Sequence, residues 1–318
     1  MARATGNEGP IDGNTVAVQR WDAGEIGAAR RRLGAAAGAH RLGVAIVGID
    51  PGKRSTPPHV HADEDEIFYV LAGGGFSWQS SGSRDARTYA ISEGDVLVHE
   101  SGGDAHTLIA GEHGLTVIVL AEGSRTGITY LPRTKGFWLG SRWSPADAPP
   151  PFAADAELGP LEVPETVSPR PGSILAAADC PVDSEREGRF GMSYRNLGHH
   201  AGADRLVMSI DELDPGARSC PMHWHTVREE CFYILGGSGS VTIGADRHEL
   251  FPGAFVLRPP WTHVPHAFDA GPDGLRYLTM GDLLPGDACV YPDSNKLSFG
   301  RTATFRIEPL EYYDGERT

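Results

Sequence analysis

An internal repeat constrains the fold of this chain more than any other feature of its sequence. The stretch PPHVHADEDEIFYVLAG at residues 57–73 recurs as PMHWHTVREECFYILGG at residues 221–237. Histidines, a glutamate and a glycine recur with the same displacement of 164 positions, the separation of residues 57 and 221. A chain of 318 residues is long enough for two related domains, and a hydrophobic content of 40% can fill two cores. The repeat therefore predicts two similar domains in tandem.

Each copy of the repeat places two histidines and a glutamate where they can meet. The histidines are two positions apart, so on a strand both side chains leave the same face. If the polar run that follows is a turn, the glutamate opens the next strand and points back at the same place. Imidazoles together with a carboxylate suit a transition metal. The predicted ligands are His59, His61 and Glu66 in the first copy and His223, His225 and Glu230 in the second.

The rest of the sequence is rich in strand and turn signals. Apolar stretches such as 42–49 (LGVAIVGI) and 67–71 are short, and Gly, Pro and Asp turns separate them. Many short strands with regular turns are typical of a β-barrel or sandwich. The Ala-rich segment 28–40 is compatible with a helix, but its counterpart contains MSYRNLG, which resembles a strand. We therefore predict strand and turn in both copies.

Composition also indicates the domain boundaries. The predicted units are a disordered lead over residues 1–15, a first domain over 16–143, a Pro-rich linker over 144–171 and a second domain over 172–318. Pro-rich sequence cannot lie inside a sheet, which is why the linker is placed there. Segments 127–140 and 287–300 share a pattern, and we expect both to wrap back over their barrels.

The charge of the chain excludes some partners. A formal net charge of −14 argues against nucleic acid and against an anionic membrane, because both need a basic surface. The first residues contain no apolar core, so we expect neither a signal peptide nor a membrane span, and a cytoplasmic protein. The cysteines have no CxxC spacing and are expected to be free thiols packed in the core, although two of them flank the second ligand set. They are Cys180, Cys220, Cys231 and Cys289.

The spacing G-x6-H-x-H-x4-E-x6-G resembles the first motif of the cupin superfamily, although the usual gap between the first Gly and the first His is five residues. It is present twice, as Gly52, His59, His61, Glu66 and Gly73 and as Gly216, His223, His225, Glu230 and Gly237. The resemblance covers nearly the whole chain. It implies an all-β tandem bicupin: two cupin jelly-roll barrels (double-stranded β-helices), each with a metal held inside by three histidines and one glutamate. Such a ligand set suits Fe, Mn, Ni, Cu or Zn, and does not decide between them.

The second cupin motif should supply a third histidine to each site. In the first domain His106, after a Gly-Gly-Asp turn, matches the motif better than its competitors His99 and His113. In the second domain the sequence offers two candidates. Spacing from the preceding prolines favours His263, whereas the His-Ala-Phe ending favours His266, which we take as the predicted ligand.

The remaining polar residues near the motifs have simpler interpretations. The acidic run Asp63-Glu64-Asp65 is expected to be a solvated turn. The equivalent turn of the second copy contains Arg228 and Glu229, so this position is polar but its charge can have either sign. Arg54 and Arg218 could reach a substrate carboxylate, but we expect them to face solvent on the approaching strands.

Within the superfamily, the chain resembles bicupins that cleave flavonols, the quercetinase-like group, and bacterial cupins of unassigned activity. This resemblance implies a metal-dependent dioxygenase for a small aromatic or other apolar molecule. Glu66 and Glu230 would then accept a proton as well as bind metal. Residues that share their strand faces would line an apolar pocket. These are Phe68, Val70, Phe232 and Ile234.

Other functions remain open at this point. Oxalate decarboxylases are also bicupins, but they resemble R-x-x-H-x-H with Trp after the Glu, whereas Arg54 and Arg218 are five residues before the His and Ile67 or Cys231 follows the Glu. Gentisate-type dioxygenases usually lack the glutamate that both copies keep. A metal-dependent isomerase or lyase would use the same ligands without dioxygen, and a non-catalytic binding protein would need only the pocket. A homodimer is expected because cupin sheets often pair edge to edge.

Overall fold

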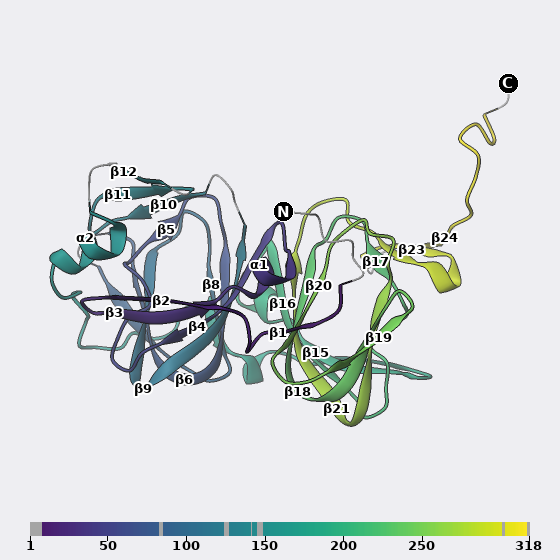
Figure 1. The fold of residues 1–318 in the computed structure, drawn as a ribbon, viewed down its shortest axis with the longest axis horizontal. Coiled ribbons are helices and arrows are strands. Elements are labelled where there is room, and N and C mark those ends of the chain that lie inside the picture. Colours follow the sequence, from purple (N-terminus) through teal and green to yellow (C-terminus); the bar gives the residue numbers. More distant parts are fainter. Residues whose placement is uncertain are drawn as a thin grey trace.

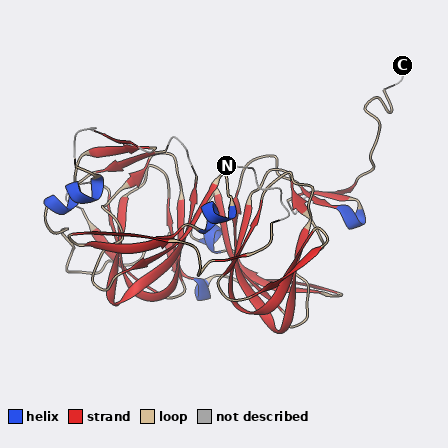
Figure 2. Ribbon diagram, viewed as in Figure 1, coloured by secondary structure: helices blue, strands red, loops and turns tan. Residues whose placement is uncertain are grey.

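The computed structural model describes residues 8–82, 85–123, 127–140, 142–144, 149–300 and 303–316. Figure 1 shows two β-barrels side by side, the first drawn from purple to teal and the second from green to yellow. Strands dominate both barrels, and the few helices are short (Figure 2). The prediction of two tandem all-β barrels is confirmed. None of the described helices is both long and apolar enough to cross a membrane.

The first barrel contains a large antiparallel sheet and a small one. The large sheet runs in the order β13 (Ile174–Ala176), β8 (Asp95–His99), β6 (Glu66–Ser80), β9 (Ala105–Glu122), β4 (Leu42–Ile49), β3 (Ile26–Arg31) and β2 (Val18–Ala23), with β7 (Arg87–Ser92) paired to β6. The small sheet runs β12 (Arg142–Ser144), β11 (Gly136–Leu139), β10 (Ile128–Leu131) and β5 (Val60–His61). The segment expected to wrap back over the barrel therefore pairs with the strand that carries His61.

The second barrel repeats this plan. Its large sheet runs β1 (Ile11–Asp12), β20 (Ala254–Arg258), β18 (Glu230–Ile243), β21 (His266–Asp282), β16 (Leu206–Leu213), β15 (Phe190–Arg195) and β14 (Asp183–Glu187), with β19 (Asp246–Leu250) paired to β18. Its small sheet runs β17 (Trp224–His225), β22 (Cys289–Tyr291), β23 (Lys296–Phe299) and β24 (Ala303–Arg306).

Alternation along the strands gives each large sheet two apolar faces. In β6, Phe68 and Val70 belong to the core inside the first barrel, whereas Ile67 and Tyr69 face the other way. Ile67 and Tyr69 belong to a core that both halves share, which also contains Met208 from β16. Because both faces are covered, β8 and β20 are buried at every residue.

Two strands are exchanged between the barrels. Ile11–Asp12 pairs with β20 of the second barrel, and Ile174–Ala176 pairs with β8 of the first. The predicted disordered lead is therefore wrong for β1, whereas residues 1–7 lie outside the described part. The predicted second domain also differs, because its first strand completes the sheet of the first domain.

The helices depart from the predicted pattern of strand and turn. Leu33–Ala37 forms α1 and Leu197–His200 forms α3, while the strand expected just before α1 is present as β3. The prediction of strand and turn is wrong for these two segments, where a turn of helix places Leu33 and Leu197 fully buried in the shared core. The repeat itself holds, since both copies contain the same helix. Two short 3-10 helices also occur, η1 (Ala177–Asp179) and η2 (Pro292–Ser294).

The predicted linker packs against the first barrel. Pro151–Glu157 forms α2, which begins at a proline as helices often do. Asp155 of this helix is fully buried and pairs with Arg54 and Arg133 of the first barrel. Arg54, expected to face solvent, is only 3% exposed, because it holds this helix in place. Residues 145–148 of the linker lie outside the described part.

The motif glycines at the ends of the repeats have a steric explanation. Gly73 and Gly237 have φ of 78° and 82°, beside irregularities where β6 and β18 bend. A Cβ at either position would lie 2.3 Å from a backbone oxygen, that of Gly114 or Gly274. Only glycine fits both the left-handed backbone and this close approach.

Candidate metal centres

The first barrel brings its four predicted ligands together. His61 ends β5, Glu66 opens β6 and His106 lies at the start of β9. His59 is held beside His106 by reciprocal backbone hydrogen bonds of 3.2 and 2.9 Å. The ligand atoms of His59, His61 and Glu66 lie within 4.8 Å of one another, and Nε2 of His106 is 3.0 Å from Oε2 of Glu66.

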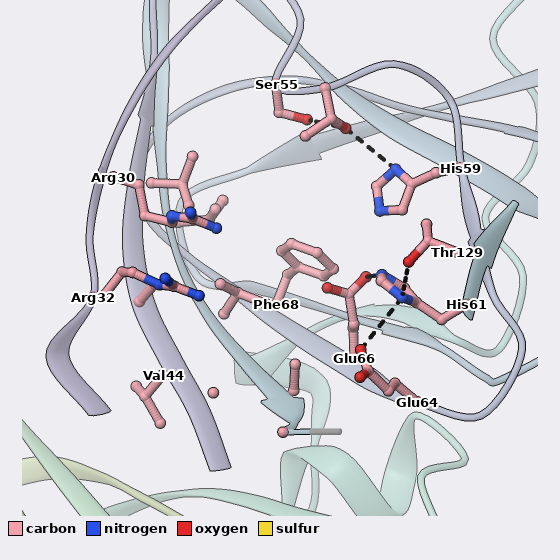
Figure 3. A pocket seen from close by; sticks show the side chains of 18 of the residues that line it. Arg30, Arg32, Val44, Ser55, His59, His61, Glu64, Glu66, Phe68 and Thr129 are labelled. Carbon is pink, nitrogen blue, oxygen red and sulfur yellow. Dashed lines mark hydrogen bonds and ion pairs between the residues drawn. The ribbon is translucent and has the colours of Figure 1, made fainter. Parts of the chain in front are cut away.

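Hydrogen bonds outside this cluster orient the three imidazoles, and Figure 3 shows the one between His61 and Thr129. Nδ1 of His59 donates to the carbonyl of Pro57 at 3.0 Å, and Nδ1 of His106 faces the carbonyl of Asp104 at 3.3 Å. Nδ1 of His61 is 3.1 Å from the hydroxyl of Thr129. A carbonyl accepts only a protonated nitrogen, so the neutral ring of His59 leaves Nε2 unprotonated and available to a metal.

The protonation states in the first centre also suit a cation. Burial, together with the neighbouring imidazoles, lowers the pKa of His59 to about 3, so its ring is neutral near pH 7. Burial alone would raise the pKa of Glu66, but the imidazoles of His61 and His106 hold it below its usual range. Imidazole nitrogens together with an ionised carboxylate form the donor set that divalent transition metals bind. The residues therefore fit such an ion, whose identity the donor set leaves undecided.

His99, the competitor of His106, lies behind the cluster. Its ring stacks on that of His106 with centroids 3.8 Å apart and an angle of 5°. It is buried, and its Nε2 has no hydrogen-bond partner among the described residues. His113 is exposed further along β9. The structure thus places His106 in the cluster, and His99 supports it by packing.

The second barrel assembles the equivalent residues. Ligand atoms of His223, Glu230 and His266 lie within 4.8 Å of one another, and Nε2 of His225 is 3.3 Å from Oε1 of Glu230. Of the two candidate third ligands, His266 lies in this cluster, whereas the ring of His263 packs on tryptophan rings. Oε2 of Glu230 is buried with no hydrogen-bond partner in the described part of the chain. A bound cation would satisfy this oxygen.

The second centre has additional polar neighbours. Nδ1 of His225 is 2.6 Å from Oδ2 of Asp287, and Sγ of Cys289 lies 3.3 Å from Nε2 of the same ring. Sγ of Cys220 lies 3.5 Å from Nδ1 of His223. Sequence reasoning noticed Cys220 but missed Asp287 and Cys289. The similarity of segments 127–140 and 287–300 was the available signal, because it places Cys289 where the first domain has Thr129.

These neighbours change the charge of the second centre. Burial opposes ionisation of Cys220 and of His223, yet their mutual contact lowers the pKa of the thiol and raises that of the imidazole to about 9. Burial also opposes the charge on His225, but Glu230 and Asp287 raise its pKa to about 12. Without metal, these two imidazoles are therefore protonated near pH 7, in contrast to His59.

A cavity of about 700 Å³ adjoins the first centre. His59, His61, Glu66 and His106 line one part of it, and Phe68 contributes to the wall as predicted. Val70 does not line this cavity and lies deeper, in the core of the first barrel. The corresponding residues Phe232 and Ile234 are buried in the core of the second barrel, where the ring of Phe232 lies 5.6 Å from that of His266.

Two arginines that the sequence did not single out also line this cavity. Arg30 and Arg32 point into it from the wall opposite His59 and His61 (Figure 3). The two arginines expected near substrate are used elsewhere. Arg54 pairs with Asp155, and Arg218 forms a two-pronged ion pair with Asp269 at 2.7 Å.

The acidic turn before Glu66 is not simply solvated. Glu64 lines the cavity, with Oε2 3.4 Å from Nδ1 of His61. Asp65 is 2% exposed, and its counterpart Glu229 is 1% exposed. Both carboxylates are buried because they accept hydrogen bonds from backbone N–H groups, from Ser101 in the first case and from residues 40–42 in the second. The prediction of a solvated turn is wrong for these two residues.

Comparison with known proteins agrees with the repeated fold. The family described as "Cupin domain" matches residues 45–121 and 209–280. An oxalate decarboxylase of Lactobacillus farciminis in a formate complex is 16% identical, with a TM-score of 0.59 over 88% of this chain and 88% of that one. A deletion mutant of Bacillus subtilis oxalate decarboxylase is 14% identical, with a TM-score of 0.58 over 86% of this chain and 76% of that one.

A third similar structure is a Bacillus subtilis oxalate decarboxylase studied for its Mn(II) centres. It is 14% identical, with a TM-score of 0.59 over 88% of this chain and 79% of that one. At these identities the likeness shows the fold. A search of curated proteins finds no match to this chain. With two matched cupin domains and a ligand set in each barrel, the chain is a tandem bicupin of the cupin superfamily.

Proposed function

We propose that the first centre is the active site of a metal-dependent dioxygenase whose substrate is an organic acid with an apolar body. The observation that supports this proposal is the arrangement of the cavity, in which the ligand cluster and a pair of arginines line opposite walls (Figure 3). The proposal differs from the expectation for a purely apolar substrate, because the arginines call for an anion.

The two arginines share one face because of strand alternation. Arg30 lies on β3 and Arg32 follows two positions later, whereas Arg31 between them lines a different cavity. Nε of Arg30 is buried without a hydrogen-bond partner among the described residues, while its Nη2 donates to Oε1 of Gln19 at 3.2 Å. Burial and the nearby Arg32 lower the pKa of Arg30. A carboxylate between the two guanidinium groups would relieve this unfavourable placement.

The rest of the cavity favours an apolar body of some size. Aliphatic and aromatic side chains make up much of the wall, among them Trp21, Val44, Phe68, Val119 and Leu131. A volume of about 700 Å³ lies within the range of roughly 300–1,000 Å³ that is typical of small-molecule sites. It is far larger than a two-carbon diacid needs.

This geometry orients the substrate. If the carboxylate binds Arg30 and Arg32, the opposite end of the molecule lies against His59, His61 and Glu66. A divalent metal there would supply Lewis acidity and open positions for a substrate oxygen and for dioxygen. Both atoms of dioxygen enter the product in a dioxygenation, so no further reductant is required.

The chain's own residues would handle the substrate proton. Glu66 was predicted to accept it, but its low pKa and its contact with His106 suit a ligand better than a base. Glu64 lines the same cavity and is not part of the ligand group, so it is better placed to accept a proton from a substrate hydroxyl.

A lyase is the second candidate. Several structural neighbours are oxalate decarboxylases, one of them studied for Mn(II) centres, so manganese and carbon–carbon cleavage both deserve a test. The cavity supports the dioxygenase better. With the carboxylate on Arg30 and Arg32, the opposite end of the substrate, and not the carboxylate, lies at the ligand cluster.

The deciding experiment measures oxygen uptake and carbon dioxide release by metal-loaded protein with a series of hydroxylated aromatic acids. Oxygen-dependent turnover that His61→Ala abolishes would support the proposal. Carbon dioxide release without oxygen uptake under anaerobic conditions would identify a lyase. Saturable binding without turnover would identify a binding protein. Each acid is compared with its neutral amide, which should bind more weakly because it cannot pair with the arginines.

The homodimer and the cytoplasmic location remain predictions. Light scattering at several concentrations would measure the oligomeric state.

A further inference from the structure

We propose that Cys289 is a metal ligand at the second centre, which thereby binds a thiophilic divalent ion such as Zn²⁺ through His223, His225 and Cys289. The proposal concerns a different centre from the proposed dioxygenase site and does not depend on it. It also departs from the three-histidine, one-glutamate set expected of this barrel.

The geometry around His225 fits a shared ion. Ligand atoms of His223, His225 and Cys289 lie within 4.8 Å of one another. Nε2 of His225 is 3.3 Å from Sγ of Cys289 and 3.3 Å from Oε1 of Glu230. In a tetrahedral zinc site with Zn–S of about 2.3 Å and Zn–N of about 2.0 Å, nitrogen and sulfur are roughly 3.5 Å apart. The observed separations are those of donors around one ion.

The histidines are already turned toward that position. Nδ1 of His223 faces the carbonyl of Pro221 at 3.1 Å, and Nδ1 of His225 faces Asp287 at 2.6 Å. Such contacts fix the ring and leave Nε2 for a metal. Sγ of Cys289 is nearer to Nε2 of His225 than to Nδ1, which lies 3.6 Å away.

A second observation points to a cation independently of the thiol. Glu230 is 6% exposed, and its Oε2 is buried with no hydrogen-bond partner among the described residues. A buried carboxylate oxygen without a donor is costly, and a cation at the centre would remove the cost. Cys220, in contrast, lies on the Nδ1 side of His223 and therefore faces away from this position.

The first centre has a different residue at the same place. Thr129 lies opposite His61 in the ladder of β10 and β5, as Cys289 lies opposite His225 in the ladder of β22 and β17. The hydroxyl of Thr129 only orients His61, whereas a thiolate is a soft and strong ligand. The two centres are therefore expected to select different ions. Binding at the second centre converts the Cys289 thiol to a metal thiolate and displaces the proton from each imidazolium that becomes a ligand, so protons are released to solvent without oxidation or reduction.

Cobalt substitution of the full-length protein tests the proposal. A thiolate bound to Co²⁺ gives a sulfur-to-metal charge-transfer absorption in the near ultraviolet, which nitrogen and oxygen ligands do not give. We expect this absorption in the parent protein and in His61→Ala, which lacks the first centre. We expect it to disappear in Cys289→Thr, which introduces the residue of the first centre, and to persist in the matched thiol variant Cys220→Ser.

Zinc competition gives a second measurement. We expect Cys289→Thr to weaken zinc binding at the second centre by at least about tenfold and to leave the first centre unchanged. Cobalt retained at the first centre shows that the variant is folded, and Cys289→Ser repeats the test with a smaller change of shape. Charge-transfer absorption that survives in Cys289→Thr, or its absence from parent protein that carries two cobalt ions, would overturn the proposal.

Discussion

Glu229 accepts a hydrogen bond of 2.9 Å from the backbone N–H of Arg41, across the boundary between the two halves of the chain. Nε of Arg41 in turn donates to Asp282 at 2.7 Å. The opposite side of the boundary has the equivalent arrangement, with Arg205 paired to Glu122 at 2.8 Å and to Asp65 at 3.5 Å. The shared apolar core is therefore closed on both sides by charged residues of the repeat.

Removal of the Glu229 carboxylate should destabilise the protein strongly. It accepts hydrogen bonds from the backbone of residues 40, 41 and 42, and Glu229→Ala leaves these donors without a partner. We expect the free energy of unfolding to fall by about 3 kcal/mol, measured by urea unfolding. Glu187→Ala, at an exposed position, is the control and should change it by less than about 0.5 kcal/mol. Equal losses in both variants would contradict this account of the boundary.

Gly73→Ala should also be costly. Its φ of 78° is unfavourable for alanine, and the added Cβ would lie 2.3 Å from the carbonyl oxygen of Gly114. We expect a loss of about 2–4 kcal/mol, visible as a lower Tm. Gly48→Ala is the matched control, because nothing lies within 4 Å of its new Cβ. A Gly73→Ala variant as stable as Gly48→Ala would show that the bend is not required.

The pair of His225 and Asp287 predicts a pH dependence of the metal-free protein. Burial opposes the imidazolium, but Glu230 and Asp287 raise the pKa of His225 to about 12. A histidine with a raised pKa stabilises the folded state fully below its unfolded value of about 6.5, and this contribution is lost as the pH rises toward 12. Asp287→Asn weakens it. We expect Asp287→Asn to lower the free energy of unfolding by about 2 kcal/mol at pH 6 and by less at pH 10.

Urea unfolding of chelator-treated protein at the two pH values measures this difference. In a His225→Gln background the same Asp287→Asn change should lose its pH dependence, because the titrating partner is gone. If Asp287→Asn destabilised the protein more at pH 10 than at pH 6, Asp287 would not be the group that raises the pKa of His225.

The arginines of the first cavity should control substrate affinity. Arg30→Met removes a charged hydrogen bond to the proposed carboxylate, so KM should rise about 10- to 100-fold while kcat changes little. Arg31→Met is the matched control, since that side chain lines a different cavity. A similar KM in both variants would show that the substrate carboxylate does not bind at Arg30.

Metal content should separate the two centres. His61→Ala and His225→Ala each remove a ligand from one cluster only. Elemental analysis of each purified variant should show the loss of one ion, with the other retained. Loss of both ions in either variant would mean that the centres are not independent.

The sequence predicted which residues would lie together in each barrel, because their spacing is set by backbone geometry. Two histidines at alternate positions leave the same face of the chain, and a glutamate that follows a turn can point back at them. This holds although β5 and β6 belong to different sheets. The same reasoning could not find Arg30 or Arg32, because their strand reaches the cavity only through the closure of the barrel. It also misread Asp65 and Glu229, because their partners are distant in sequence: Ser101 and Arg205 for Asp65, and the backbone of residues 40–42 for Glu229.

The reciprocal exchange of β1 and β13 has a consequence for the history of the molecule. Each barrel takes one edge strand from the other half of the chain, so a cut within residues 149–173 would leave two unfinished sheets with exposed edges. After the ancestral duplication, neither copy remained a free-standing module. The two halves therefore complete each other's sheets and form one inseparable folding unit.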